Sequence, residues 1–435
     1  MTTTTAPTPS SSLWHDRRFR TFWIGETLSQ FGDRISELAL PLIAVVLLDA
    51  SPTQVGLLTA AVWGPNLVSL FVGSWVDQQP QKRLLLVVAD LARAAVLATV
   101  PLAYAVDALT LVHLYVVALL AGLGQVLFST AYPPFFVALV PRDRFLDANS
   151  KLSASRSASF IAGPAVGGAL VQALTAPVAI LVDALTFVAS AFQIGRVRVE
   201  EAPVENPQGH SLLRRAREGL VYVLRHPFLR YSLGCATTIN FFTLMASALL
   251  VLYASRTLGL SAGLIGLALG IGALGGLVGA VAAPVLAARF GVGPVIVAGA
   301  ILFPAPLALL ALAGGPEWSA ALVLGAVEFV SALGVMLFDV NLNALQASVT
   351  PDAVRSRVSG AFSTINYGIR PLGAVVGGVL GTQIGLRPTL VVAALGGTLS
   401  ALWLLPSPIP RVHSLDGLAP PEDAGRFASP AADTL

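Results

Sequence analysis

The sequence predicts an all-α integral membrane protein, with twelve transmembrane helices in two pseudo-symmetric six-helix halves. Of its 435 residues, 55% are hydrophobic and only 11% are charged, whereas a soluble protein is about one quarter charged. The chain also contains twelve apolar stretches that are long enough to cross a bilayer. Its first and second halves resemble each other at a constant offset of 210 residues.

The twelve apolar stretches each have about the 20 residues that a transmembrane helix needs. The breaks between them hold turn-forming and charged residues, as in Asp49–Pro52 and Gly314–Glu317. We expect spans at 21–47, 54–76, 84–106, 109–139, 150–173, 177–195, 229–254, 261–288, 292–313, 319–345, 357–383 and 386–405.

Hydrophilic segments divide the chain into parts. Residues 1–20 begin with a Thr/Ser/Pro-rich run and are expected to form a disordered N-terminal tail. The longest hydrophilic stretch between spans, 196–228, separates an N-terminal half (21–195) from a C-terminal half (229–405). Residues 406–435 form a C-terminal tail.

The internal repeat has at least eight matching positions in one register. They include a loop proline, Pro141 with Pro351, and glycines such as Gly163 with Gly373. Chance similarity between apolar, glycine-rich segments is the alternative, and the shared register argues against it. A parallel repeat of six spans is a known transporter plan, with the substrate site between the halves near mid-membrane.

The positive charges predict the orientation. With both termini in the cytoplasm, twenty of the 26 lysines and arginines fall in inside segments. Two, Arg256 and Arg387, fall in outside loops. Because cytoplasmic loops carry an excess of Lys and Arg, both termini are expected inside.

The fifth span carries a stripe of small residues. Ser155, Ser159, Gly163 and Gly167 follow one another at i+4, so on a helix they share one nearly bare face. Such a face lets another helix backbone approach closely, and Pro164 disfavours a straight helix. We expect this stretch where the two halves meet and move; the alternative is ordinary tight packing in a static bundle.

The first span carries a polar stripe. Glu26, Gln30, Asp33 and Glu37 step by four, three and four residues along one helix face, with Arg34 beside them. A charge at bilayer depth costs at least about 2.5–3.5 kcal/mol, so this face must point into the bundle or a wet cavity. One arginine cannot neutralise three carboxylates, which makes the three acids candidates for proton coupling.

Other spans add candidates. Glu328, near the middle of span ten, is a fourth candidate proton carrier, with a structural hydrogen bond as the alternative. Asp183 and Arg156 are interpreted as a structural ion pair. The candidates for a substrate cavity are polar and aromatic side chains within spans, although aromatic residues also serve as core or interface anchors. They are Gln30, Arg34, Trp63, Asn240, Phe241, Asp339 and Tyr367.

Several function classes find no support in the sequence. The pattern Gly270–Gly275 fits a dinucleotide motif but lies inside span eight with no preceding strand. No phosphate-binding G-x-x-x-x-G-K-[ST] motif occurs, and the five histidines have no metal-ligand spacing. The single cysteine, Cys235, excludes an intramolecular disulfide. We therefore expect no enzyme activity, cofactor, metal, nucleotide or nucleic-acid partner.

Two motifs resemble those of a known family. Gly73–Asp77 with Lys82 and Arg83 is similar to the loop between spans two and three of the major facilitator superfamily, with Gln78 and Pro80 as departures. The span-five motif is similar to the signature of proton-coupled antiporters, with Ser159 replacing an upstream glycine. Its residues are Ser159, Gly163, Pro164, Gly167 and Gly168.

Three further motifs narrow the resemblance. Phe31–Asp33, Asp90–Arg93 and Asp183–Phe187 resemble the branch of macrolide-type efflux proteins and siderophore exporters. The arginine that many drug antiporters carry in span four is absent from 109–139. Over residues 17–405 the chain thus resembles the drug:proton antiporter branch of the superfamily.

The resemblance implies a secondary active exporter. Two halves would rock about a central cavity, and proton influx would drive efflux of an amphipathic drug, antibiotic or secondary metabolite. Asp77, Lys82 and Arg83 would form a cytoplasmic gate, in which Asp77 caps a helix N-terminus or pairs with an arginine. The expected partners are a small-molecule substrate, protons and the lipid bilayer.

The expected state and place are a monomer in the plasma membrane, in a bacterium. Other functions stay open at this point. A siderophore exporter and an uptake permease share the fold, and a non-transporting membrane receptor or assembly protein is a further alternative. The intramembrane carboxylates favour transport, since membranes tolerate such groups mainly where they function.

Overall fold

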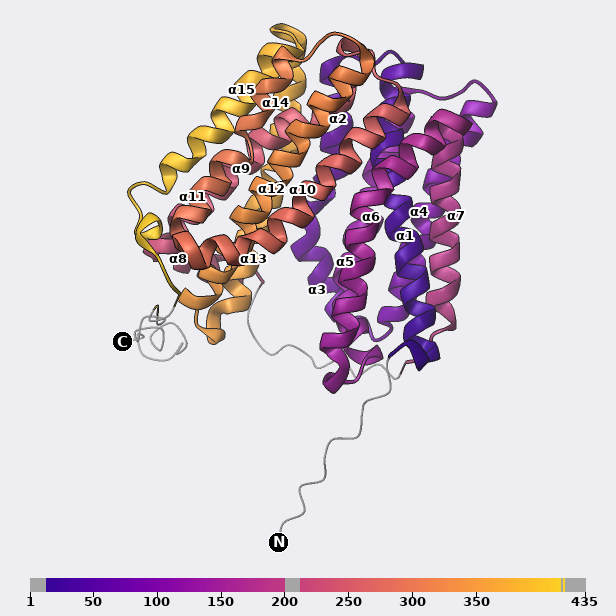
Figure 1. The fold of residues 1–435 in the computed structure, drawn as a ribbon. Coiled ribbons are helices and arrows are strands. Elements are labelled where there is room, and N and C mark those ends of the chain that lie inside the picture. Colours follow the sequence, from indigo (N-terminus) through magenta and orange to yellow (C-terminus); the bar gives the residue numbers. More distant parts are fainter. Residues whose placement is uncertain (1–12, 200–211, 416–417, 419–435) are drawn as a thin grey trace.

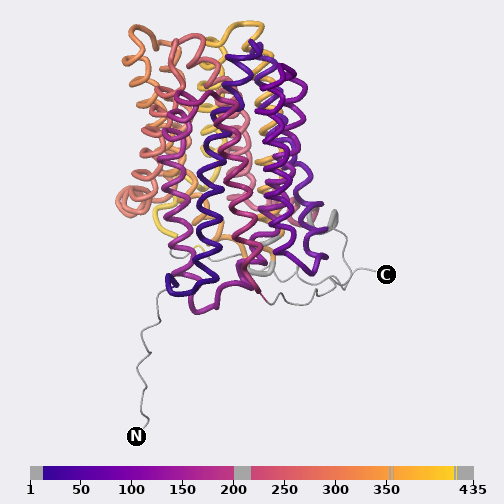
Figure 2. The backbone as a smooth tube through the Cα atoms, turned by 90° about the vertical axis from the view of Figure 1, so that its right-hand side faces the viewer, coloured from indigo at the N-terminus to yellow at the C-terminus, as the bar shows by residue number. Residues whose placement is uncertain are grey.

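The computed structural model describes residues 13–199, 212–415 and 418, and every regular element in these ranges is a helix. Twelve helical segments run side by side between the two ends of the molecule (Figures 1 and 2), which confirms the all-α membrane fold. The segments are α1 (Arg17–Leu42) with η2 (Ile43–Leu47); α2 (Pro52–Trp63), η3 (Gly64–Val68) and α3 (Ser69–Asp77); α4 (Lys82–Ala105); α5 (Leu111–Leu139); α6 (Phe145–Leu174); α7 (Ala176–Arg196); α9 (Pro227–Leu252) with η5 (Tyr253–Thr257); α10 (Ala262–Phe290); α11 (Val292–Leu302) with η6 (Ala305–Leu312); α12 (Glu317–Val349); α13 (Asp352–Gly368) with α14 (Arg370–Gln383); and α15 (Leu386–Leu399) with η7 (Ser400–Trp403).

Ten of the twelve segments are long and apolar enough to cross a membrane by length and composition. The other two do not meet this criterion, for different reasons. In α1, four ionisable side chains stand in the middle of the helix: Glu26, Asp33, Arg34 and Glu37. The eleventh segment is divided near Ile369 into α13, of 17 residues, and α14, of 14 residues.

The backbone reproduces the 210-residue repeat. A π-helical turn ends both the first and the seventh span, at Ile43–Leu47 and Tyr253–Thr257. Thr175 and Gly385 stand at equivalent positions, and each has a φ of 88°. The repeat is therefore a property of the fold.

Segments outside the spans are partly described. Residues 13–20, assigned from sequence to the N-terminal tail, contain η1 (Leu13–His15) and the first turn of α1; Leu13 is fully buried. The 196–228 linker contains α8 (Leu212–Arg225), which packs on α13. Residues 1–12, 200–211 and most of 416–435 lie outside the described part of the chain.

The two halves touch through two pairs of glycines, both at the end of the bundle away from Arg17. We call this the far end, and the end with Arg17 the terminal end. A Cβ on Gly56 of α2 would lie 2.9 Å from Gly378 Cα of α14, and a Cβ on Gly168 of α6 would lie 2.9 Å from Gly266 Cα of α10. The two pairs are related by the 210-residue repeat. Glycine is required there because the backbones themselves are in contact.

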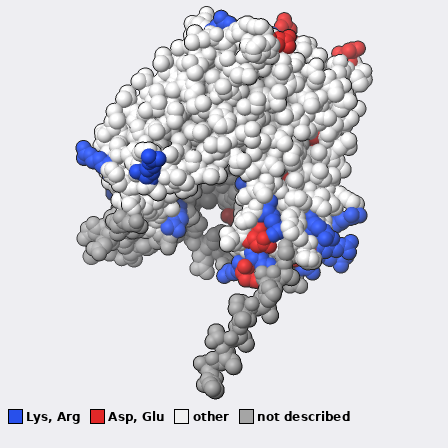
Figure 3. Space-filling model, viewed as in Figure 1, with Lys and Arg blue, Asp and Glu red and all other residues white. Residues whose placement is uncertain are grey.

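The buried apolar core shows where the halves separate. At the far end, one continuous cluster includes Ile43 and Leu58 of the first half and Leu249 and Leu324 of the second. Toward the terminal end, the core divides into separate clusters that each belong to a single half, one in the first half and two in the second. The space-filling view is hollowed between the halves at that end (Figure 3). The molecule is thus closed at the far end and open at the terminal end.

This stretch of α6 lies where the two halves meet, because it packs against α10, but its small-residue stripe faces α1. The expectation is therefore right for the stretch and wrong for the stripe. A Cβ on Gly163 would lie 2.5 Å from Arg34 Cβ of α1, and one on Gly167 would lie 3.2 Å from Ile35 Cα. The stripe therefore packs inside the first half. Gly168, one residue further on, meets the second half, as do the backbone oxygens of Ile161 and Pro164.

Candidate functional site

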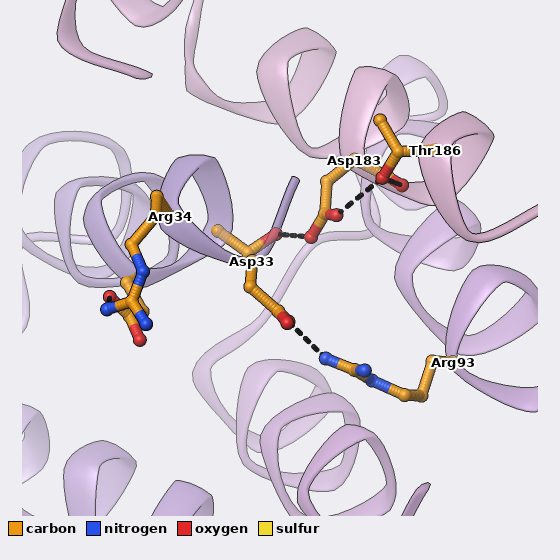
Figure 4. A network of polar contacts seen from close by, with 7 residues as sticks. Asp33, Arg34, Arg93, Asp183 and Thr186 are labelled. Atoms are coloured by element: carbon orange, nitrogen blue, oxygen red, sulfur yellow. Dashed lines mark hydrogen bonds and ion pairs between the residues drawn. The ribbon is translucent and has the colours of Figure 1, made fainter. Parts of the chain in front are cut away.

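A polar cluster occupies the interior of the first half, where α1, α4 and α7 pack together. Arg93 of α4 forms an ion pair with Asp33 of α1, and its guanidinium lies 3.9 Å from the ring centroid of Phe187. Figure 4 shows the two side chains pointing toward each other between the helices. Arg93 belongs to the Asp90–Arg93 motif of the sequence, but the sequence did not mark it as a site residue.

Asp183 of α7 is fully buried beside this pair. Its carboxylate accepts hydrogen bonds from the Ser36 and Thr186 hydroxyls, the latter at 3.2 Å (Figure 4). The predicted ion pair between Asp183 and Arg156 is wrong. Arg156 is exposed, and the hydroxyls of α1 and α7 satisfy the aspartate instead.

The cluster opens into a polar cavity of about 280 Å³. Glu26 accepts a hydrogen bond from Gln30 Nε2 at 2.8 Å, and its second oxygen is buried without a partner in the described structure. α1, α4, α5 and α6 supply the walls. The lining residues are Glu26, Ser29, Gln30, Asp33, Arg34, Arg93, Gln125, Phe128, Ser129, Tyr132, Arg156 and Ser159.

Arg34 and Glu37 form a second ion pair on α1. Arg34 Nη1 lies 2.6 Å from Glu37 Oε2, and the guanidinium lies 5.3 Å from the ring centroid of Phe160 on α6. The predicted polar stripe therefore divides into two groups. Glu26, Gln30 and Asp33 line the cavity, whereas Glu37 pairs with the arginine of its own helix.

An aromatic and cationic contact joins the two halves. The rings of Trp63 (α2) and Tyr367 (α13) stack with centroids 6.3 Å apart. The Arg370 guanidinium lies 4.5 Å from each ring centroid, and its Nε donates to Asn240 Oδ1 at 2.9 Å. Three of the predicted cavity residues thus meet around an arginine that sequence reasoning missed. An arginine inside a span is itself a signal, because it needs a partner there.

Of the other candidates in the second half, Asp339 lies within electrostatic range of Arg370 but forms no ion pair with it. Glu328 and Asp339 of α12 are half-buried, with no hydrogen bond or ion pair to the described residues. Gly272 of α10 leaves room for Glu328, since a Cβ there would lie 2.5 Å from Glu328 Cβ. The backbone of Phe241 lies directly against Gly373 of α14. None of these residues lines the 280 Å³ cavity.

The predicted gate residues lie in the turn between α3 and α4, at the terminal end. Lys82 Nζ donates to the backbone oxygens of Asp77, at 3.0 Å, and Gln79, at 2.6 Å. Arg83 donates to Val197 O at 3.0 Å. Asp77 is exposed and is the last residue of α3. The predicted cap or arginine pair belongs to the state in which this end is closed, so it stays a prediction.

The far end is held by polar contacts between the halves. Arg256 of η5 donates to Val45 O at 3.0 Å and forms an ion pair with Asp49. The hydroxyls of Thr53 and Thr382 lie 2.8 Å apart. These bonds close the end at which the glycine pairs meet.

The sequence matches a known family over nearly its whole length. The profile of the Major Facilitator Superfamily matches residues 22–373 and 233–426. The chain belongs to this superfamily. Its members carry small-molecule substrates across membranes, and the chain is accordingly a multi-pass membrane protein of a transporter family rather than of an enzyme family.

Relatives with similar sequences include efflux pumps. The multidrug efflux pump Tap of Mycolicibacterium fortuitum is 27% identical over 404 residues, which cover 88% of this chain and 94% of Tap. Tap of Mycobacterium tuberculosis is 29% identical over 410 residues, covering 91% and 94%. The uncharacterized MFS-type transporter YfiS of Bacillus subtilis is 25% identical over 382 residues, covering 86% and 88%.

Solved structures share the fold. A bacterial homologue of the iron transporter ferroportin in an inward-facing state superposes with a TM-score of 0.73 at 17% identity, covering 90% of this chain and 98% of that one. The nucleoside transporter NupG gives a TM-score of 0.68 at 13% identity, covering 90% and 98%. At such identities the likeness shows the fold alone.

Proposed function

We propose that the protein is a proton-coupled exporter of amphipathic small molecules that works by alternating access. The observation that carries this proposal is the group of carboxylates around the cavity of the first half: Glu26, Asp33 and, behind them, Asp183. Membranes tolerate buried acids mainly where they function, and a coupling proton needs an acid reachable from one side at a time. The similarity to Tap supports the efflux direction.

The terminal end is proposed to face the cytoplasm, since most lysines and arginines gather in the segments there. The described conformation is then the inward-facing one, in which a substrate enters from the cell interior. The proposed cytoplasmic gate forms when this end closes, and it consists of Asp77, Lys82 and Arg83. The span-five motif is proposed to hold α6 against α1 during this closure. A monomer contains the complete cavity.

The proposed coupling residues are Asp33, Glu37, Glu26 and Glu328. Asp33 lies midway along the 26 residues of α1 and the five of η2, so it is close to the bilayer centre. Glu328 is the twelfth of the 33 residues of α12, and its carboxylate has no partner in the described structure. An acid without a partner at this depth binds a proton more readily than a solvated one.

The experiment is accumulation of a compound panel in cells with and without the protein, each with and without a proton uncoupler. We expect lower accumulation of at least one amphipathic compound in expressing cells, and loss of this difference with uncoupler. An Asp33→Asn variant should behave like cells lacking the protein. Asp107→Asn, at an exposed turn whose positive φ asparagine tolerates, is the matched control. Identical accumulation in all cells for every compound would contradict the proposal.

A further inference from the structure

Asp90 of α4 is a fully buried acid that the proposed export mechanism does not yet use. It is 0% exposed, and neither carboxylate oxygen has a hydrogen-bond partner there. The Ser190 hydroxyl of α7, which is also fully buried, lies beside it and is the polar group placed to donate to it. An ionised carboxylate in this setting would bear a large desolvation cost, whereas a protonated one would not.

Arg93 stands one helical turn further along the same helix, which puts the two residues on one face. Its Nη2 is committed to Asp33, while its Nε is buried without a partner in the described structure. The guanidinium rests on the Phe187 ring, a flat surface along which it can slide without losing its cation–π contact. Gly124 of α5 leaves room for the stem, since a Cβ there would lie 2.5 Å from Arg93 Cγ.

Several charged groups surround these residues. Asp33 and Glu26 of α1 lie on the cavity side, and Asp183 of α7 is held by its two hydroxyl donors. Arg156 of α6 also reaches the cavity, and α5 presents Gln125 and Tyr132 to it. Within this set, Arg93 is the cation that pairs directly with an acid, Asp33. Asp90, on the helix of Arg93 itself, is the second acid with which it can pair.

We propose that Arg93 is a proton-operated switch that passes between Asp33 and Asp90, so that the acid without the arginine carries the proton. This inference rests on the proposed function and names the groups that would perform its coupling. In the described state Arg93 pairs with Asp33 and Asp90 is protonated. In the other state Asp33 is protonated toward the cavity, and Arg93 pairs with an ionised Asp90.

The switch conserves charge. The proton that leaves Asp90 is the one that binds Asp33, which faces the cavity, while the guanidinium keeps its charge throughout. The net charge of the buried cluster is the same in both states, so no uncompensated charge is created inside the membrane. Because Asp33 belongs to α1 and both other residues belong to α4, the exchange also changes the attachment between these two helices. Proton binding at the cavity is thereby coupled to the position of α1 relative to α4.

The test is infrared spectroscopy of the purified protein in nanodiscs at neutral pH, without substrate. A protonated carboxylic acid has a C=O stretch that is separate from the carboxylate bands. The Asp90 component is the difference between the spectra of the wild type and Asp90→Asn. We expect this difference to contain a protonated-acid band. The same subtraction in an Asp33→Asn background should lack the band, because Arg93 is then free to ionise Asp90.

Two outcomes would overturn the switch. If the subtraction shows no protonated acid in the wild-type background, Asp90 is not the proton carrier. If the band persists in the Asp33→Asn background, Asp90 is a fixed neutral acid that serves only structure. Should Asp90→Asn fail to fold, Asp90→Glu keeps the acid and should shift the band. Since no substrate is used, this result is separate from the export assay, and a protein that exports nothing could still show the switch.

Discussion

Replacing Gly266 by alanine should displace the conformational equilibrium, because α6 and α10 are in backbone contact at this residue. A Cβ on Gly266 would lie 2.9 Å from Gly168 Cα and closer still to Pro164 O. An ordinary carbon contact is about 3.5–4.0 Å, so the helices must part by roughly 0.6–1 Å. Backbone atoms cannot rotate away as a flexible side chain would.

The expected cost is that of an overpacked contact, about 1–3 kcal/mol. It is borne only while the far end is closed, so it disfavours the described conformation by roughly 5- to 150-fold. The gain in helix propensity on replacing glycine by alanine, up to about 1 kcal/mol, is the same in both conformations. Gly263→Ala is the matched control, because its Cβ would lie 3.8 Å from the Gln172 side chain, an ordinary contact.

The assay is double electron–electron resonance between spin labels on cysteines, in a background that lacks the buried Cys235. One pair, at Val112 and Leu312, reports the far end, and the other, at Leu146 and Phe290, reports the terminal end. All four side chains are exposed. We expect Gly266→Ala to lengthen the far-end distance and shorten the terminal-end distance. If Gly266→Ala gives the same distances as Gly263→Ala, the glycine contact does not control closure of the far end.

Three further substitutions test separate parts of the account. Gly163→Leu should abolish transport in a protein that still inserts, because leucine would collide with the Arg34 stem; near-normal efflux would mean a slack contact. Asp77→Asn should reduce turnover several-fold more than substrate affinity, as the residue is exposed in a turn outside the cavity; an equally steep loss of binding to solubilised protein would contradict this. Arg256→Ala should weaken far-end closure by roughly 0.2–1 kcal/mol, measured with the far-end spin labels; an unchanged distance distribution would show that the ion pair with Asp49 contributes nothing.

The fold could be predicted from sequence because each of its signals is local. Apolar length sets the spans, and the observed helices begin and end within a few residues of the expected ones: α5 covers 111–139 where 109–139 was expected. The repeat could also be predicted from the sequence, since Gly168 and Gly378 match at an offset of 210 residues. Their partners Gly266 and Gly56 follow the same offset, but only the structure shows that these glycines touch across the halves.

The partners of the charged residues could not be predicted, because they depend on how helices are rotated against each other. Helix spacing correctly placed Glu26, Gln30 and Asp33 on one face, yet it does not tell which helix faces them. Arg93 therefore escaped notice as the partner of Asp33, and Asp183 was given the wrong partner. Which residues share a face of one helix could be predicted, because this depends on their spacing alone.

Proton-driven transport in proteoliposomes tests the central claim most directly, using a compound that the cell assay identifies. The account predicts uphill transport by the wild type and by Asp107→Asn under an imposed pH gradient, abolished by uncoupler. Asp33→Asn and Glu37→Gln should lose uphill transport while downhill exchange continues, and Glu328→Gln should weaken it. If all three of these variants retain uphill, uncoupler-sensitive transport, the carboxylates are structural and the coupling assignment is wrong.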